Sequence, residues 1–329
     1  MRQEIERCRI CFSLAGEGKT VSMVCSGDAG VYGMAAPMYE LQQENKAYHQ
    51  TELVVLPGIT AANSGAAVLG GKFHYSEHKK ETHIEKVIPE NARKGYDIRD
   101  IINDVTDDDS FFETSEEFAI NCVTGFAKIE GRSVGIVANN PQGMGGIMDC
   151  DASDKIARHV RYCDAYNIPI LTFVDVPGFV PGPQEEQKGI IRHGAKVIYA
   201  YSESTVPKVT VITRKAYGGA YIAMCSKHIG ADYVYAWPSS EIAVMGSDGA
   251  VGILYAKELK DPEKASYVAE KKAQYEEEIM TPTIAAKRGY ISEVIKPSET
   301  RRYVANSFKF LENKKSMDKP SKKHGNIPL

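Results

Sequence analysis

The sequence predicts an α/β protein built around a mostly parallel β-sheet, on three observations. Short runs rich in β-branched and aromatic residues, typical of buried strands, alternate with segments of helical spacing. Strand–helix–strand units of this kind stack around a parallel sheet through right-handed crossovers. A hydrophobic content of 43% and a charged content of 25% are those of a globular protein. The predicted strands of the larger part are residues 133–138, 169–175, 207–213, 232–237 and 241–245, with helices at 153–166, at 187–201 and from about 219.

The chain divides into two unequal parts. Residues 1–71 have an α/β pattern of their own, residues 72–86 form a polar, charged run interpreted as a seam or linker, and residues 87–329 form a second α/β region. Ser153 is the predicted N-cap of the helix at 153–166. The remaining predicted elements are helices at 4–14, 33–45 and 61–69, strands at 20–25 and 52–56, and charged helical stretches at 258–278 and 298–313.

Charge and hydropathy exclude several classes of protein. The net charge of −3 argues against a nucleic-acid-binding protein. No apolar run reaches the roughly 18 residues that span a bilayer, and the charged N-terminus is followed by no apolar signal core. We therefore expect a cytoplasmic protein.

We predict no metal site and no disulfide framework. The seven cysteines are scattered, and Cys8 and Cys11 form a lone CxxC without a second ligand pair. His74, His78 and His83 lie in the polar run, where a solvated linker or surface helix explains them better than a metal site does.

The most informative segment is the glycine-rich turn Gly218-Gly219-Ala220. It follows the buried run 209–213 and opens an apolar helical segment. Backbone N–H groups at such a turn lack helical partners and lie at the positive end of the helix dipole, so they suit an oxyanion. A tight turn that requires glycine only for packing explains the same residues. The turn alone does not decide between the two.

Two other strand ends are candidate ligand positions, because ligands of α/β proteins bind beyond the carboxyl ends of parallel strands. Pro177-Gly178-Phe179 follows one strand, with a structural turn as the alternative, and Met245-Gly246 ends another. Asp175 is expected to cap a loop. Arg214 and Lys215 either reach a phosphate or are solvated. The remaining candidates, which we expect to be structural or on the surface, are His159, Arg192, His193 and His228.

Residues 87–329 resemble the C-terminal half of the biotin-dependent acyl-CoA carboxyltransferases, which include propionyl-CoA carboxylase beta chains, methylmalonyl-CoA decarboxylase alpha chains and transcarboxylase. The match is dense. The segments that carry it are Asn140-Pro141, 173–179, 189–196, 213–221, 235–238, 241–246 and 323–329. The resemblance implies a crotonase-like fold of stacked ββα units.

The resemblance also implies roles for the turn and the strand ends. The N–H groups of Gly219 and Ala220 would bind the ureido oxygen of biotin, and Gly218 would permit the tight turn. Pro177, Gly178 and Phe179, with Met245 and Gly246, would line the biotin pocket. Ile222 stands where many propionyl- and acetyl-CoA carboxylase chains have Asp, which favours the decarboxylase and transcarboxylase branch.

The implied partners are an acyl-CoA, a biotin carboxyl carrier protein or domain, and further copies of the chain, with association to a membrane decarboxylase complex as a further possibility. Carboxyl transfer develops negative charge on two oxygens and needs no protein nucleophile, so oxyanion stabilisation is the main requirement. The family's N-terminal crotonase-like domain, which supplies much of the acyl-CoA site, is not found in the sequence. We therefore expect this chain to contribute the biotin side of a carboxyltransferase site and to lack much of the acyl-CoA side.

Residues 1–71 resemble a middle piece of a precorrin-3B methyltransferase. The segments 26–34 and 56–61 carry the resemblance. It implies S-adenosylmethionine contacts at Gly27, Asp28, Thr60 and Ala61. Because the family's N-terminal glycine-rich loop and second domain are not found, we expect neither cofactor binding nor methylation.

Three functional hypotheses follow. The leading one is a partial carboxyltransferase subunit that moves a carboxyl group between biotin and a short-chain acyl-CoA such as propionyl-CoA or acetyl-CoA. The second is an inactive fusion or remnant that acts at most as an assembly partner. The third is an S-adenosylmethionine-dependent precorrin methyltransferase of cobalamin synthesis.

Overall fold

The computed structural model describes residues 2–21, 38, 41–42, 45–51, 83–89, 91 and 94–314. The chain forms two compact units, Met1–Phe73 and His74–Leu329. In the first unit, helix α1 (Arg2–Gly16) confirms the predicted helix at 4–14, and a 3₁₀ turn spans Lys46–Tyr48. The buried ring of Phe12 stacks on Tyr48 with 4.4 Å between ring centroids. The predicted strands at 20–25 and 52–56 and the helix at 61–69 lie almost wholly outside the described residues.

The second unit is built on a single mixed sheet, in the order β1-β2-β3-β4-β5-β6-β8, with β7 paired to β5. Strands β3, β4, β5, β6 and β8 are parallel, which confirms the predicted parallel sheet, whereas β1, β2 and β3 form an antiparallel edge. The strands are β1 (Phe112–Thr114), β2 (Cys122–Ile129), β3 (Arg132–Asn139), β4 (Ile170–Val176), β5 (Lys208–Tyr217), β6 (Tyr233–Ala236), β7 (Glu241–Ala243) and β8 (Glu293–Val294).

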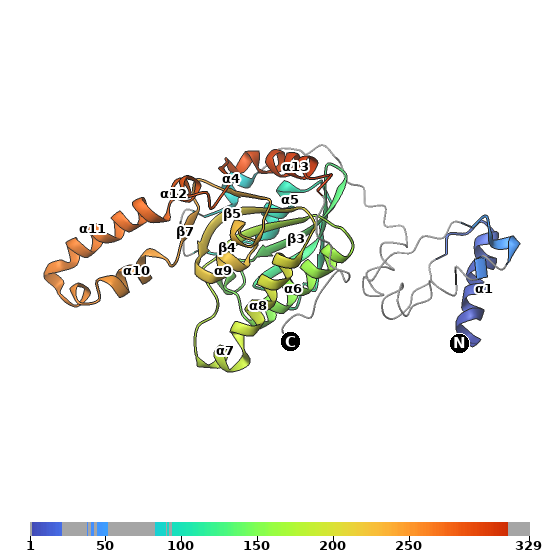
Figure 1. Cartoon of the computed structure of the whole chain (residues 1–329), viewed down its shortest axis with the longest axis horizontal. Coiled ribbons are helices and arrows are strands. Elements are labelled where there is room, and N and C mark those ends of the chain that lie inside the picture. The colour runs from blue at the N-terminus through green and yellow to red at the C-terminus, as the bar shows by residue number, and fades with distance from the viewer. Residues whose placement is uncertain are drawn as a thin grey trace. The chain divides into compact units, whose positions relative to one another are not determined.

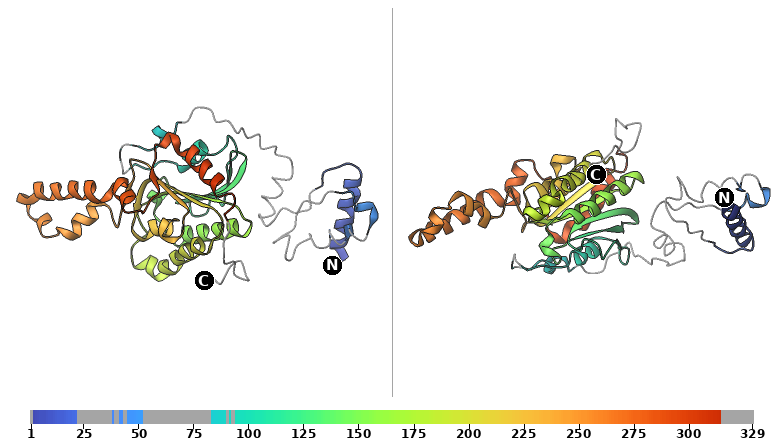
Figure 2. Two further views of the ribbon diagram at one scale, coloured as in Figure 1. Left: turned by 45° about the horizontal axis from the view of Figure 1, so that its top comes forward. Right: turned by 90° about the horizontal axis from the view of Figure 1, so that it is seen from below.

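Helices cover both faces of this sheet. Helices α6, α8 and α9 pack on one face around Tyr201, and α4, α5 and α13 pack on the other around Trp237 and Phe308 (Figures 1 and 2). The helices are α4 (Ile84–Val87), α5 (Ile98–Val105), α6 (Cys150–Ala165), α7 (Pro183–Lys188), α8 (Ile190–Glu203), α9 (Gly218–Ala223), α10 (Ser247–Leu254), α11 (Ala265–Tyr275), α12 (Pro282–Lys287) and α13 (Thr300–Phe310). The shorter turns of helix are Met144–Gly146, Lys227–Ile229, Glu258–Lys260, Pro262–Lys264, Glu276–Met280 and Pro297–Glu299.

Local sequence explains where these helices begin. Asp97 caps α5 by accepting from the N–H of Arg99, and the buried residues of α5 recur at helical spacing (Ile98, Ile101, Ile102, Val105). The predicted N-cap Ser153 is wrong. Asp149 caps α6 by accepting from the N–H of Ala152, and Ser153 lies buried inside the helix.

Other predicted boundaries also differ, among them the end of β7, at Ala243 rather than at residue 245. The helix predicted at 187–201 is two helices, α7 and α8, separated by Gly189 at φ +89°, a value that glycine adopts readily. Strand β5 continues to Tyr217 rather than ending at 213. The charged stretch predicted at 258–278 lies mainly in α11, which with α10 forms an arm that projects from the sheet (Figure 1).

Within the described part of the chain, no helix is long and apolar enough to cross a membrane. The same residues hold no group of three His, Cys, Asp or Glu side chains that could bind a metal ion.

Candidate functional site

The carboxyl ends of β4, β5 and β7 lie at the same edge of the sheet. Val176 of β4 pairs with Ala216 of β5, and Tyr217 of β5 pairs with Ala243 of β7. The segments predicted as ligand positions follow these strands, so the parallel register brings the ends together. A Cβ atom built on Gly218 would lie 2.9 Å from the carbonyl oxygen of Val244, which shows how closely β5 and β7 approach.

The turn Gly218-Gly219-Ala220 opens helix α9. Gly218 has φ +58°, in the left-handed region. Gly219 is exposed, and a Cβ atom on it would meet no atom within 4 Å, whereas Ala220 is fully buried. The first N–H groups of a helix have no acceptor within it, and Tyr217 at the N-cap provides no side-chain capping bond. The N–H donors of this turn therefore lie at an open position beside the carboxyl ends of β4, β5 and β7.

Pro177-Gly178-Phe179 is held by a short parallel bridge to Met148. The Met148 N–H donates to the Gly178 carbonyl at 3.0 Å, and the Val180 N–H donates to the Met148 carbonyl at 2.8 Å. The ring of Phe179 packs on Gly194 of α8, where an added Cβ would lie 3.0 Å from it. The aromatic ring thus contributes to the packing of α8.

Met245 and Gly246 are held by a hydrogen bond from the arm formed by α10 and α11. The Tyr275 hydroxyl of α11 donates to the Met245 carbonyl at 3.2 Å. Gly246 lies against the ring of Tyr217, whose hydroxyl donates to Glu241. The end of β7 is therefore held from both β5 and α11.

A buried polar network beneath these strand ends was missed by sequence reasoning. Asp175 is fully buried and accepts from the Arg214 Nε at 2.9 Å and from the Lys215 N–H at 3.1 Å. Arg214 also donates to the Lys94 carbonyl at 3.0 Å and lies 5.0 Å from the ring centroid of Tyr96. Burial raises the pKa of Asp175, and the Arg214 charge opposes that rise. Arg214 is therefore neither solvated nor aimed at a ligand phosphate.

The other candidates have structural surroundings. Ile222 on α9 is half-buried against the core. The His193 ring contacts Asp154 at 2.8 Å, and the same carboxylate oxygen accepts from Lys196 at 2.8 Å, which joins α6 to α8. His159 is buried in α6, and burial lowers its pKa to about 4. His228 is exposed.

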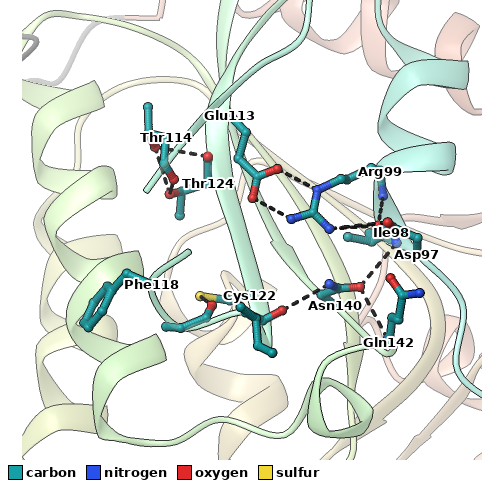
Figure 3. Close-up of polar contacts among 12 residues, drawn as sticks. Asp97, Ile98, Arg99, Glu113, Thr114, Phe118, Cys122, Thr124, Asn140 and Gln142 are labelled. Carbon is teal, nitrogen blue, oxygen red and sulfur yellow. Dashed lines mark hydrogen bonds and ion pairs between the residues drawn. The ribbon is translucent and has the colours of Figure 1, made fainter. Parts of the chain in front are cut away.

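Figure 3 shows a second polar network, at the end of β3. Arg99 makes two hydrogen bonds to Glu113, at 2.6 and 2.8 Å, and the Asn140 amide donates to the Ile120 carbonyl at 3.0 Å. The Asn140 side-chain oxygen accepts from the Gln142 N–H at 3.3 Å. Asn140, one of the residues that carry the family resemblance, thus orders the loop after β3.

Two sets of predicted positions lie outside the described residues. The predicted S-adenosylmethionine contacts Gly27, Asp28, Thr60 and Ala61 form the first set. The terminal segment 323–329 is the second.

A mixed sheet covered on both faces by helices defines a layered α/β protein, and similar solved structures identify its fold. The match to the transcarboxylase 12S structure determined with methylmalonyl-coenzyme A and methylmalonic acid bound has a TM-score of 0.73 and 48% identity, over 78% of this chain and 49% of that one. The beta subunit of a geranyl-CoA carboxylase from P. aeruginosa matches with a TM-score of 0.63 and 24% identity, over 88% of this chain and 56% of that one, and supports the fold alone. The predicted crotonase-like fold is confirmed.

The sequence comparisons give the family. The carboxyl transferase domain model matches residues 53–327, and the chain belongs to that family. The propionyl-CoA carboxylase beta chain of Roseobacter denitrificans is 52% identical over 249 residues, which cover 76% of this chain and 48% of that protein. The methylmalonyl-CoA decarboxylase subunit alpha of Propionigenium modestum is 51% identical over 75% of this chain and 48% of that protein. The chain spans about half the length of the curated relatives it matches.

The N-terminal residues match a different family. The model of the tetrapyrrole (corrin/porphyrin) methylases covers residues 2–102, which confirms the predicted resemblance at the level of that family. The two matches overlap over residues 53–102.

Proposed function

We propose that the chain is part of a carboxyltransferase that moves a carboxyl group between biotin and a short-chain acyl-CoA. Its family and the names of its relatives, which act on propionyl-CoA and methylmalonyl-CoA, support this proposal. The observation that carries it is the open first turn of α9, which offers backbone N–H groups where the ends of β4, β5 and β7 meet.

The chemistry of this turn suits biotin. When biotin gives up its carboxyl group, its ureido oxygen carries negative charge and needs hydrogen-bond donors. The N–H groups of Gly219 and Ala220 would supply them, each donor contributing on the order of 3–4 kcal/mol to the stabilisation of a developing oxyanion. The open space at Gly219 leaves room for a ring, and Gly218 gives the backbone its left-handed turn.

The neighbouring strand ends would line the pocket. Pro177 and Gly178 would border the turn on the β4 side, because they follow Val176, which pairs with Ala216, and Phe179 packs against α8. Met245 and Gly246 border it on the β7 side. Ile222 would face the acyl group and favour the methylmalonyl-CoA decarboxylase and transcarboxylase branch over the carboxylases.

The partners follow from the same proposal. Biotin would arrive on a carrier protein or domain, and the acyl-CoA would be the second substrate. A homo-oligomer is proposed because the transcarboxylase 12S relative is described as a hexamer assembly. A role in a decarboxylase complex would make a membrane component a further partner, since a relative is the alpha subunit of methylmalonyl-CoA decarboxylase.

The test is decarboxylation or carboxyl transfer by the full chain with free biotin and malonyl-CoA or methylmalonyl-CoA. Gly219→Pro removes one donor, and proline is tolerated in the first turn of a helix, so a 10²- to 10³-fold loss of rate is expected without unfolding. Gly219→Ala keeps the N–H but adds a methyl group to the open space, so it measures the cost of lost room, and the further loss in the proline variant measures the donor. Equal rates for the proline and alanine variants would refute the oxyanion assignment.

Two other functions have a specific observation behind them. The match of residues 2–102 to tetrapyrrole methylases favours a methyltransferase, which titration calorimetry with S-adenosylmethionine tests directly. A non-catalytic assembly partner is the alternative function for the residues that match the carboxyl transferase domain. A folded chain without transfer activity or biotin binding would support the second reading.

A further inference from the structure

Strands β4 and β5 lose their register next to the candidate site. They pair residue by residue from Ile170 and Lys208 to Val174 and Ile212, and then resume at Val176 and Ala216. One residue of β4, Asp175, therefore lies opposite three residues of β5, Thr213, Arg214 and Lys215. This is a β-bulge two residues wide.

Buried polar contacts hold each residue of the bulge. The Asp175 carboxylate accepts from the Arg214 Nε at 2.9 Å and from the Lys215 N–H at 3.1 Å. The Thr213 hydroxyl donates to the Val174 carbonyl at 3.1 Å and lies 3.1 Å from the Tyr96 hydroxyl. The side chain of Asp175 is fully buried, and only 7% of that of Arg214 is exposed. The buried Asp175 carboxylate therefore accepts hydrogen bonds from two successive residues of the bulge, Arg214 and Lys215.

The bulge decides where β5 ends. In continuous register, Arg214 rather than Ala216 would stand opposite Val176. Each strand residue advances about 3.3 Å, so the two extra residues shorten the reach of β5 by about 7 Å. Without them, the glycine turn would lie that much further along the strand, away from the Val244 carbonyl that it now contacts. The bulge therefore sets the position of Gly218 and of the N–H groups after it.

We propose that Asp175 is a positioning residue of the candidate site, which holds the β5 bulge and thereby places the N–H donors of Gly219 and Ala220. The part of this inference that concerns biotin rests on the proposed function. Asp175 acts through Arg214 and Lys215 and does not touch the ligand itself.

A second buried carboxylate, that of Asp107, lies near the opposite ends of the strands and serves as a matched control. Asp107 is 1% exposed, accepts from the N–H groups of Glu130 and Gly131 at 2.9 and 2.8 Å, and pairs with Arg301 at 2.5 Å. It has the same chemistry as Asp175, a buried carboxylate with backbone donors and an arginine. Because the Glu130–Gly131 turn precedes β3, it lies at the amino end of the parallel strands.

The experiment compares Asp175→Asn with Asp107→Asn in the full chain. Three quantities are measured: the melting temperature, the NMR resonances of the Gly218–Ala220 amides, and the dissociation constant of biotin methyl ester. Both variants should lose melting temperature. Only Asp175→Asn should displace the three amide resonances and weaken biotin binding, by tenfold or more. Asp107→Asn should leave the dissociation constant within twofold of the parent value.

A milder variant covers the case in which Asp175→Asn does not fold. Tyr96→Phe removes only the hydroxyl that lies next to Thr213 and interacts with the Asp175 carboxylate, and it should displace the same resonances in part. Unchanged Gly218–Ala220 resonances in a folded variant, or unchanged biotin affinity of Asp175→Asn, would overturn the positioning role. If the amides move but the parent chain binds no biotin, the positioning role stands and the proposed function fails.

Discussion

Gly218 and Val244 meet backbone to backbone, and the contact leaves no room for a side chain on the glycine. The Val244 carbonyl oxygen would lie 2.9 Å from a Cβ atom on Gly218, and Gly218 has φ +58°. Its neighbour Gly219 has neither constraint. Of two adjacent glycines, one is therefore required by the fold, and the other leaves a space that a ligand can enter.

The two glycines should respond differently to alanine. Gly218→Ala adds backbone strain and a close contact, and should cost about 2–3 kcal/mol of unfolding free energy. Gly219→Ala should change it by no more than about 0.5 kcal/mol. Urea denaturation of both variants gives the comparison, and equal losses would contradict the different surroundings of the two glycines.

Phe179 and Gly194 form a second close pair, which a double-mutant cycle can test. Gly194→Ala places a methyl group 3.0 Å from the Phe179 ring and should destabilise the protein by about 1–3 kcal/mol through overpacking. Phe179→Leu removes ring atoms, so the double variant should be more stable than the sum of the single losses predicts. Strictly additive losses would show that the ring does not press on α8.

Strands β3, β4 and β5 could be predicted because they contain several β-branched residues, most of which are buried in the structure. Strand β2 was missed because Gly125 and Ala127 weaken its pattern. Gly125 is needed for a contact visible only in three dimensions, since a Cβ there would lie 2.4 Å from the Phe112 carbonyl oxygen. Local propensity does not report such cross-strand contacts.

The positions of the candidate site followed from a general rule, that parallel strands end at one edge of a sheet. The end of β5 could not be predicted in this way, because two charged residues, Arg214 and Lys215, indicate that the strand ends and the chain becomes exposed to solvent. Arg214 is buried through its pair with Asp175, 39 residues away in sequence. Similarly, Asp149 and Ser153 are both suitable N-cap residue types, and the contacts of the folded chain select Asp149.

The buried cysteines should resist alkylation while the protein is folded. Burial raises the pKa of Cys122 to about 12 and that of Cys225 to about 11, and it also raises the pKa of Cys163. The thiolate is the reactive form, so these thiols are doubly protected, by burial and by protonation. Among the cysteines that the structure describes, iodoacetamide labelling followed by mass spectrometry should modify the half-buried Cys11 first. Labelling of Cys122, Cys163 and Cys225 should require denaturant, and their early modification in native buffer would contradict the described packing.

His159 should make the protein less stable in mild acid. Burial lowers its pKa from 6.5 to about 4, while a hydrogen bond involving the Gly125 backbone opposes the shift. As the pH falls from 6.5 to 4, the unfolded state takes up a proton that the folded state refuses, so the unfolding free energy decreases. A pKa lowered from 6.5 to about 4 corresponds to roughly 3 kcal/mol, lost progressively over that range and not further below it.

His159→Gln removes this titration, so its pH dependence should be the shallower one. Urea denaturation of both proteins at intervals from pH 8 to pH 4 measures the difference in unfolding free energy. The difference should be constant above pH 7, which serves as the internal control for the packing change itself. It should then move in favour of the glutamine variant as the pH decreases. Parallel curves down to pH 4 would mean that the buried imidazole accepts a proton without cost, contrary to its environment between Phe126 and Cys163.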